Sequence, residues 1–453
     1  MSKMFKSINP YSGDVIKEYK AHSKAQVKDI LHKSEEVFRD WKNVELSERS
    51  ELIRKVGELL EERKTEYGKL ITDEMGKPIA ESIAEIEKCA WLCEFYAVNA
   101  EDFLSDELID TEAQESFISY DPLGCILAVM PWNYPFWQVM RFAAPTLTAG
   151  NVGLLKHASN VSGCAMALQE LFIDAGYPEG CFQTLLTDHE VIEDLIAHKT
   201  VKAVTLTGST KAGQAIASVA GKNLKKTVLE LGGSNACIVW EDADLDQYID
   251  VMVKARMQNT GQSCIAAKQF IVVEDIYDRF MDIFTAKIKA LKNGDPAEQD
   301  TEVGVMARED LAEELYTQVE KSIKKGAKVV LGNTRDKAFY EPTVITNVKP
   351  GMTVFDEEIF GPVAAVIKAK NREESIELAN HTDFGLGTML FTESIDDALQ
   401  LTGEIEDGAF FINELVKSDP RLPFGGTKGS GYGRELSREG ILEFVNKKTV
   451  YIK

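Results

Sequence analysis

From about residue 123 onward, short continuous apolar segments alternate with stretches that have helical spacing. Such segments occupy residues 125–129, 152–155, 203–206, 228–231 and 236–239. Strands buried on both faces of a sheet are apolar throughout, and parallel strands need long crossover connections, which are usually helical. The pattern therefore predicts an α/β fold built on a mainly parallel sheet.

A second series follows, with apolar segments near 269–273, 363–367 and 387–391 and an amphipathic helix from Ile276. The first hundred residues instead have helical spacing, and Ser23 with Gln26 has the signature of a capping box. A chain of 453 residues exceeds what one hydrophobic core usually supports. Because no repeat or Pro/Gly-rich linker separates the two series, two or three interleaved domains are expected.

The formal net charge of −22 limits the partners of the chain. Nucleic acids and anionic membrane surfaces are polyanions, so neither is expected to bind. No apolar run approaches the roughly 20 residues of a membrane helix, and the first six residues lack the apolar core of a signal peptide. An anionic ligand would need local positive charge, which makes single Lys and Arg residues inside motifs informative.

The seven cysteines are scattered and lack the paired spacing of a zinc site, so no metal is expected. Reduced thiols in a cytoplasmic enzyme fit this distribution better than a disulfide scaffold. A lone cysteine is usually a small buried hydrophobe, but Cys264 follows Gln258-Asn-Thr-Gly-Gln-Ser, whose small and polar residues suit an accessible thiol. The thiolate is the competent nucleophile, so this site would need a lowered pKa or a nearby base.

Two other segments offer polar groups for such a site. Glu230 ends a predicted strand and precedes two glycines that permit a tight turn, although a solvated strand-end charge is the simpler interpretation. The run from Met130 to Trp137 contains two prolines and four aromatic residues. Its Asn133 amide could donate hydrogen bonds inside a pocket, and a packed loop is the alternative.

The segment from Gly208 to Gly213 follows a predicted strand and opens a helical run. It is not a dinucleotide fingerprint, and Gln214 stands where a P-loop requires lysine. A strand–turn–helix unit of this kind still presents backbone N–H groups and a helix dipole to an anion. A plain helix cap is the competing interpretation.

Seven segments together resemble, in order, the motifs of the aldehyde dehydrogenase superfamily. They are Pro131-Trp-Asn133-Tyr-Pro, Leu155-Lys156-His-Ala, Thr207-Gly-Ser209-Thr, Glu230-Leu-Gly-Gly, Gly261-Gln-Ser-Cys264, Glu357-Glu358-Ile-Phe360-Gly-Pro and Pro423-Phe-Gly-Gly. The resemblance runs from about residue 5 to the C-terminus. It implies a Rossmann-type NAD(P)-binding domain over 1–104 and 120–230 and an α/β catalytic domain over 231–429. It also implies a small β oligomerisation arm and C-terminal segment over 105–119 and 430–453, in a homodimer or homotetramer.

The resemblance also implies catalytic roles. Cys264 would attack the aldehyde carbon, and the oxyanion would be held by the Asn133 amide and the Cys264 backbone N–H. Hydride transfer to the nicotinamide would leave a thioester, and Glu230 would activate the water that hydrolyses it.

The residues implied to bind the cofactor are Trp132, Lys156, Ser159, Gly208, Ser209, Leu231, Glu358 and Phe360. Many members of the superfamily carry Glu three residues after the lysine, and here that position is Ser159. A glutamate would repel a 2′-phosphate, whereas serine can donate a hydrogen bond to it. NADP is therefore the expected cofactor, with NAD as the alternative.

Two segments, one running from Trp137 past Arg141 and one beginning at Ser418, resemble the short bacterial succinate-semialdehyde dehydrogenases. This narrower resemblance implies a small aldehyde substrate, succinic semialdehyde, held by these three residues. Arg141 could instead pair with an acidic neighbour in a helix. The open alternatives are another aliphatic aldehyde or semialdehyde, a CoA-acylating dehydrogenase, which Glu230 disfavours, and a catalytically silent binding protein, which the presence of Cys264 disfavours.

Overall fold

Six strands form the first large sheet of the computed structural model, which describes residues 3–453. In spatial order they are β19 (Gly431–Tyr432), β9 (Lys226–Glu230), β8 (Val201–Thr207), β5 (Cys125–Met130), β6 (Val152–His157) and β7 (Phe182–Thr184). All neighbours are parallel except β19 and β9. The parallel α/β arrangement predicted from the apolar segments is confirmed.

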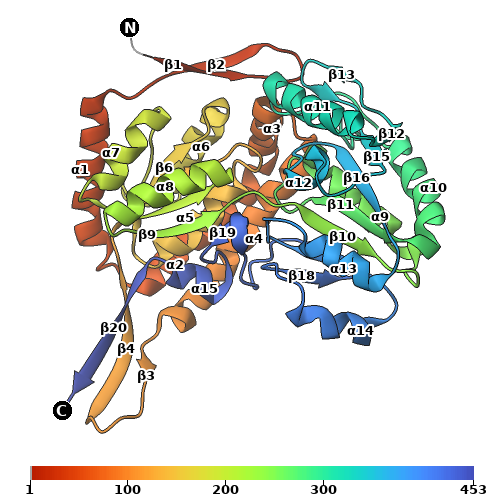
Figure 1. Cartoon of the computed structure of the whole chain (residues 1–453). Helices are drawn as coiled ribbons and strands as arrows, with labels where there is room; N and C mark the ends of the chain where they lie inside the picture. Colours follow the sequence, from red (N-terminus) through yellow and green to blue (C-terminus); the bar gives the residue numbers. More distant parts are fainter. Residues whose placement is uncertain (1–2) are drawn as a thin grey trace.

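The second large sheet has seven strands and lies beside the first in Figure 1. Its spatial order is β12 (Lys328–Leu331), β15 (Thr343–Thr346), β16 (Val363–Ala369), β11 (Ala267–Val273), β10 (Asn235–Val239), β17 (Thr388–Phe391) and β18 (Phe410–Ile412). Only the β12–β15 pair is antiparallel. Helix α10 (Glu274–Ala290) covers it with Ile276, Phe280, Phe284 and Ile288, as its spacing predicted.

Helices cover both sheets, because each buried sheet face must pack against apolar side chains. Those of the first unit are α1 (Lys24–Trp41), α2 (Leu46–Glu62), α3 (Lys64–Met75), α4 (Ile79–Leu104), α5 (Trp137–Thr148), α6 (Ser162–Asp174), α7 (Ile192–Ala197), α8 (Thr210–Lys222) and α15 (Ser437–Leu442). Those of the second are α9 (Leu245–Met257), α10, α11 (Glu309–Lys324), α12 (Thr353–Asp356), α13 (Arg372–Asn380) and α14 (Ile395–Gln400). The predicted capping box at Ser23 is present at the start of α1.

The helical prediction for the first hundred residues misses an antiparallel hairpin at the N-terminus. It consists of β1 (Met4–Ile8) and β2 (Val15–Lys20). Every residue of β2 is exposed or half-exposed, so no alternation of apolar and polar residues marked it as a strand. A second small hairpin, β13 (Arg335–Asp336) with β14 (Phe339–Tyr340), lies in the other unit.

A three-stranded antiparallel arm projects from the body of the molecule (Figure 1). It contains β3 (Glu107–Leu108), β4 (Glu115–Pro122) and the C-terminal β20 (Val445–Ile452). Residues 431–432, from the segment assigned to the arm by resemblance, instead form β19 of the first sheet. No helix within residues 3–453 combines the length and apolarity needed to cross a membrane.

The parallel strands bring several sequence motifs to one edge of the first sheet. β5 ends at the start of the aromatic run, β8 ends just before Gly208, and β9 ends at Glu230. Ligands of open α/β sheets bind at the carboxyl ends of the strands. The same edge faces the turn that joins α9 to β11, and that turn contains Cys264.

Candidate active site

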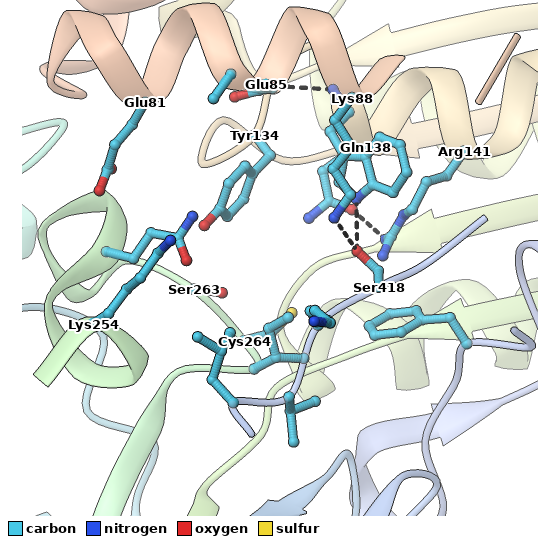
Figure 2. Close-up of a pocket in the computed structure, with 18 of the residues that line it drawn as sticks. Glu81, Glu85, Lys88, Tyr134, Gln138, Arg141, Lys254, Ser263, Cys264 and Ser418 are labelled. Atoms are coloured by element: carbon cyan, nitrogen blue, oxygen red, sulfur yellow. Dashed lines mark hydrogen bonds between the residues drawn. The ribbon is translucent and has the colours of Figure 1, made fainter. Parts of the chain in front are cut away.

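Cys264 lies where two cavities meet. A pocket of about 350 Å³, drawn in Figure 2, and a second cavity of about 200 Å³ share only Cys264 and Gln138 among their lining residues. We call them the pocket and the cofactor-side cavity. The Cys264 side chain is partly exposed, whereas the other six cysteines are buried and all seven are unpaired. Its thiol is therefore the one accessible to a ligand in either cavity.

The turn before Cys264 is held in a strained conformation. Asn259 and Thr260 have left-handed backbone angles, with φ of 57° and 55°, which cost about 1–3 kcal/mol for residues other than glycine. The Asn259 amide donates to the backbone oxygens of Asn133 (2.8 Å) and Gln262 (3.0 Å). Its backbone N–H donates to Glu81 at 2.7 Å. These bonds offset the strain and fix the turn against the aromatic run.

Asn133 is buried and lines the cofactor-side cavity with Cys264. One N–H of its side-chain amide donates to the Gln262 backbone oxygen at 3.1 Å. A side-chain amide has two N–H donors, so this bond orients the group and leaves a second donor. The arrangement suits the stabilisation of negative charge beside the thiol.

Lys268 holds the backbone on the other side of the thiol, and no motif in the sequence pointed to it. It is fully buried, and its ammonium donates to the backbone oxygens of Ser263 (2.7 Å) and Cys264 (2.6 Å). It also forms an ion pair with Glu358 at 3.1 Å. Burial raises the pKa of the Cys264 thiol to about 11, and Lys268 opposes that rise. The thiol is therefore protonated at neutral pH and needs a base or a further positive charge to react.

Glu230 ends β9 and is 2% exposed. Within residues 3–453 no group donates a hydrogen bond to its carboxylate, and it lines neither cavity. Burial raises the pKa of Glu230 well above its usual range, and the neighbouring carboxylate of Glu435 raises it further. A carboxylate with so high a pKa is a strong base once it is ionised.

The two glycines after Glu230 allow close packing rather than a left-handed turn. A Cβ on Gly232 would lie 2.6 Å from an oxygen of Glu358, and one on Gly233 would lie 2.7 Å from the Cys264 backbone oxygen. The Gly233 N–H donates to Glu358 at 3.0 Å. The absence of side chains here brings β9, the nucleophile turn and Glu358 together.

The cofactor-side cavity has the groups that a dinucleotide requires. Six residues named by the resemblance line it, namely Trp132, Gly208, Ser209, Leu231, Glu358 and Phe360. Ser209 caps α8, whose first N–H groups face this end of the sheet and suit a phosphate. The Trp132 and Phe360 rings meet edge to face at 5.8 Å between centroids. These residues fit a nicotinamide dinucleotide, with Glu358 available to its ribose hydroxyls.

Lys156 and Ser159 lie beyond this cavity, at the carboxyl end of β6. Ser159 is exposed and lines a small depression with His157. Lys156 is half-buried near the end of β6. Burial lowers the pKa of Lys156, and the nearby Asp188 opposes that effect. Their position on the neighbouring strand suits the adenosine half of a dinucleotide.

The three residues assigned to the substrate by resemblance all line the pocket. The Ser418 hydroxyl oxygen accepts hydrogen bonds from Trp137 Nε1 and from Lys88 Nζ, each at 3.0 Å (Figure 2). Arg141 is buried, and its Nε lies 2.9 Å from a carboxylate oxygen of Glu435. Its acidic partner is therefore distant in sequence and is not a neighbour on the same helix. Its guanidinium also donates to Gln138.

Lys88 is the main pocket residue that the sequence did not reveal. It lies on α4, about forty positions before the nearest motif, and its ammonium lies 4.3 Å from the centre of the Trp137 ring. A usable signal existed, because Glu81, Glu85 and Lys88 recur at helical spacing along one face of α4, and all three line the pocket.

Known proteins resemble this chain along almost its whole length. The sequence model of the aldehyde dehydrogenase family matches residues 1–450. The chain is 50% identical to a probable NADP⁺ succinate-semialdehyde dehydrogenase of Synechocystis sp., covering 98% of this chain and 99% of that protein. It is 46% identical to the NAD(P)⁺ succinate semialdehyde dehydrogenase Sad of Escherichia coli, covering 98% and 97%. The crystal structure of succinic semialdehyde dehydrogenase from Streptococcus pyogenes with NADP⁺ matches with a TM-score of 0.97, 36% identity and 99% coverage of each chain.

Proposed function

The chain belongs to the aldehyde dehydrogenase family, and from this premise we propose that it oxidises succinic semialdehyde to succinate with NADP. The observation that carries the proposal is the thiol of Cys264 at the junction of two cavities. One cavity offers a helix N-terminus and a carboxylate to a dinucleotide, and the other offers cationic and hydroxyl groups to an anionic aldehyde. The relatives named for this activity match along almost the whole chain.

Cys264 loses its thiol proton to water and forms a bond to the aldehyde carbon, and the carbonyl oxygen takes the negative charge. The free N–H of Asn133 and the Cys264 backbone N–H donate to that oxygen. An oxidised nicotinamide bound in the cofactor-side cavity would supply the hydride acceptor for this oxidation. Lys268 keeps the nucleophile turn and Glu358 in fixed positions during this step.

Glu230 removes a proton from the water that cleaves the resulting thioester. Because its carboxylate lines neither cavity, it reaches the thioester by rotation of its side chain or through the water itself. Gly233, three residues after Glu230, packs directly against the Cys264 backbone, so β9 ends next to the nucleophile turn. A base at this position favours transfer of the acyl group to water, which gives the free acid, over transfer to CoA.

NADP is preferred because Ser159 carries no charge and can donate to the 2′-phosphate, while Lys156 supplies a cation on the same strand end. The relatives from Synechocystis and S. pyogenes are named with NADP, and the one from E. coli with either cofactor.

Trp137, Arg141 and Ser418 shape the aldehyde pocket.

Two further features support an assembled cytoplasmic enzyme. The arm exposes apolar side chains, including Leu108 (73% exposed) and Tyr451 (56%), that a second copy of the chain would cover in a homodimer or homotetramer. All seven cysteines are free thiols, which suits a reducing compartment.

The test is to incubate the enzyme with NADP and an aldehyde in the absence of CoA and to follow the absorbance of the reduced cofactor. Succinic semialdehyde and butanal are compared, since both have four carbons and only one has a carboxylate. Turnover with a kcat/KM that favours succinic semialdehyde supports the proposal. Turnover that requires CoA identifies an acylating dehydrogenase, and no turnover with any aldehyde identifies a silent protein.

A further inference from the structure

The pocket contains several charged groups, and two of its four lining cations, Arg141 and Lys417, are paired with carboxylates. Arg141 is paired with Glu435, both nearly fully buried. Lys77, behind the pocket wall, is paired with Glu85, which lines it. Each of these pairs contributes little net charge, so neither by itself attracts a carboxylate-bearing substrate into a protein of net charge −22.

Lys88 differs from these cations because no carboxylate within residues 3–453 forms an ion pair with it. Glu85 and Asp419 are the acidic groups that act on it electrostatically. Glu85 is held by Lys77 and also accepts hydrogen bonds from two backbone N–H groups of the aromatic run. Asp419 forms hydrogen bonds with the Arg421 guanidinium at 2.9 and 2.7 Å. Lys88 is therefore the uncompensated cation at this end of the pocket.

The other lining lysines lie elsewhere. Lys417 is paired with Glu414, and Lys254 is exposed at the opposite end, beside Glu81 (Figure 2). Figure 2 shows Lys88, Ser418 and Arg141 together on one side of Cys264. Among the described residues, Lys88 is therefore the unpaired cation at the buried end of the pocket, next to Ser418, and Lys254 lies at the exposed end.

The hydrogen bonds of Ser418 add a second donor at the same place. A hydroxyl group has one donor and two acceptor sites. Its oxygen already accepts from Lys88 Nζ and Trp137 Nε1, so both acceptor sites are filled. The Ser418 O–H is left to donate toward the pocket. Lys88 fixes this hydroxyl and retains two N–H donors of its own.

Resting on the proposed function, we infer that Lys88 is the specificity-determining residue that binds the distal carboxylate of the substrate, jointly with the Ser418 hydroxyl. The substrate class is an aldehyde with a carboxylate at the other end of a short chain. Arg141, neutralised by Glu435, shapes the wall and orients Gln138 without supplying the net charge.

This assignment has a pH signature. Burial, together with the neighbouring Arg141, lowers the pKa of Lys88 to about 8. The ammonium is charged below that pH and becomes neutral as the pH rises through it. Preference for the charged aldehyde should therefore fall above about pH 8. The ionisation of Cys264 affects both aldehydes equally and cancels in a ratio.

The test measures kcat/KM for succinic semialdehyde divided by kcat/KM for butanal. In Lys88→Met this ratio should fall about 10- to 100-fold, the usual effect of losing a hydrogen bond to a charged group. The ratio of the wild type should fall as the pH rises through about 8, and Lys88→Arg should abolish that fall because arginine stays charged. Lys254→Met, the same substitution at the exposed end, should change the ratio less than about twofold.

An unchanged ratio in Lys88→Met, or equal losses for both aldehydes, would overturn the assignment. So would a ratio in the wild type that does not depend on pH. Turnover of butanal in the wild type separates these results from failure of the proposed function, because an enzyme that oxidises no aldehyde fails at that earlier step.

Discussion

The two cavities that meet at Cys264 are built from different parts of the chain. The cofactor-side cavity is lined mainly by strand ends and the turns that follow them, including Gly208, Ser209 and Leu231. The pocket is lined mainly by residues of α4 and α5 and of the segments 263–265 and 414–418. The first surface is therefore built largely on turns that follow strands, and the second largely on helices and loops.

This difference indicates how each surface responds to substitution. The cofactor-side cavity is formed by a helix N-terminus and by closely packed glycines. Most amino-acid substitutions at these positions should therefore disturb the fold itself. Charges on a helix face can be exchanged singly while the helix remains. Cofactor use and chemistry should thus be constrained by the sheet, and aldehyde preference by a few side chains such as Lys88.

The largest effect should come from the residue shared by both cavities. Cys264→Ala removes the nucleophile and should lower kcat/KM for any aldehyde by about 10⁴-fold or more, while leaving NADP binding largely intact. Reduced-cofactor absorbance measures the first quantity and calorimetric titration the second.

Cys237→Ala is the matched control, because Cys237 is fully buried in β10 and touches neither cavity. It should retain activity at a modest cost in stability. Substantial turnover in Cys264→Ala would mean that the two cavities do not share a nucleophile.

Glu230→Gln should produce a smaller and distinctive defect. Acylation proceeds without this base, so one equivalent of reduced cofactor should form rapidly before the reaction stalls at the thioester. Steady-state turnover should fall about 10²- to 10⁴-fold, the usual contribution of a general base. Rapid mixing followed by absorbance separates the burst from the steady rate. Steady turnover at the wild-type rate would remove Glu230 from the mechanism.

The sequence was sufficient to predict most of the fold. Continuous apolar runs marked the strands of both sheets, since a strand buried on both faces needs apolar residues at every position. The hairpin of β1 and β2 escaped because its second strand is exposed along its length. Strand order and the placement of residues 431–432 in the first sheet depend on contacts distant in sequence, which no local pattern encodes.

The site was predictable to the extent that it lies on contiguous motifs. Motif resemblance pointed to Cys264, Asn133 and Glu358, and the structure places them around one turn. Lys88 and Lys268 escaped, because their importance comes from burial and from partners that the tertiary fold supplies. The pairing of Arg141 with Glu435 likewise joins positions almost 300 residues apart.

Ser159→Glu should change cofactor preference by less than Glu230→Gln changes turnover and by more than Ser418→Ala changes aldehyde preference. Ser159→Glu places a carboxylate at the end of β6, and charges about 4 Å apart in a partly screened site interact by roughly 4 kcal/mol. Ser159 is exposed, so solvent screening should reduce the effect to about 10- to 100-fold in the ratio of kcat/KM for NADP to that for NAD. Ser159→Gln has nearly the same size without the charge and should shift the ratio far less. A wild type that prefers NAD would contradict this account of the cofactor side.

The smallest effect should come from the hydroxyl in the pocket. Ser418→Ala removes the donor aimed at the substrate carboxylate but leaves the Lys88 charge in place. The ratio of kcat/KM for succinic semialdehyde to that for butanal should therefore fall only about 3- to 10-fold, because one neutral donor contributes less than a cation. The KM for NADP should stay constant, since Ser418 lines the pocket and not the cofactor-side cavity. A fall as large as that of Lys88→Met would mean that the two groups act as a single unit, in which the lysine serves only to orient the hydroxyl. The double variant decides the matter: independent donors give multiplied losses, whereas a unit gives a loss no larger than that of either single variant.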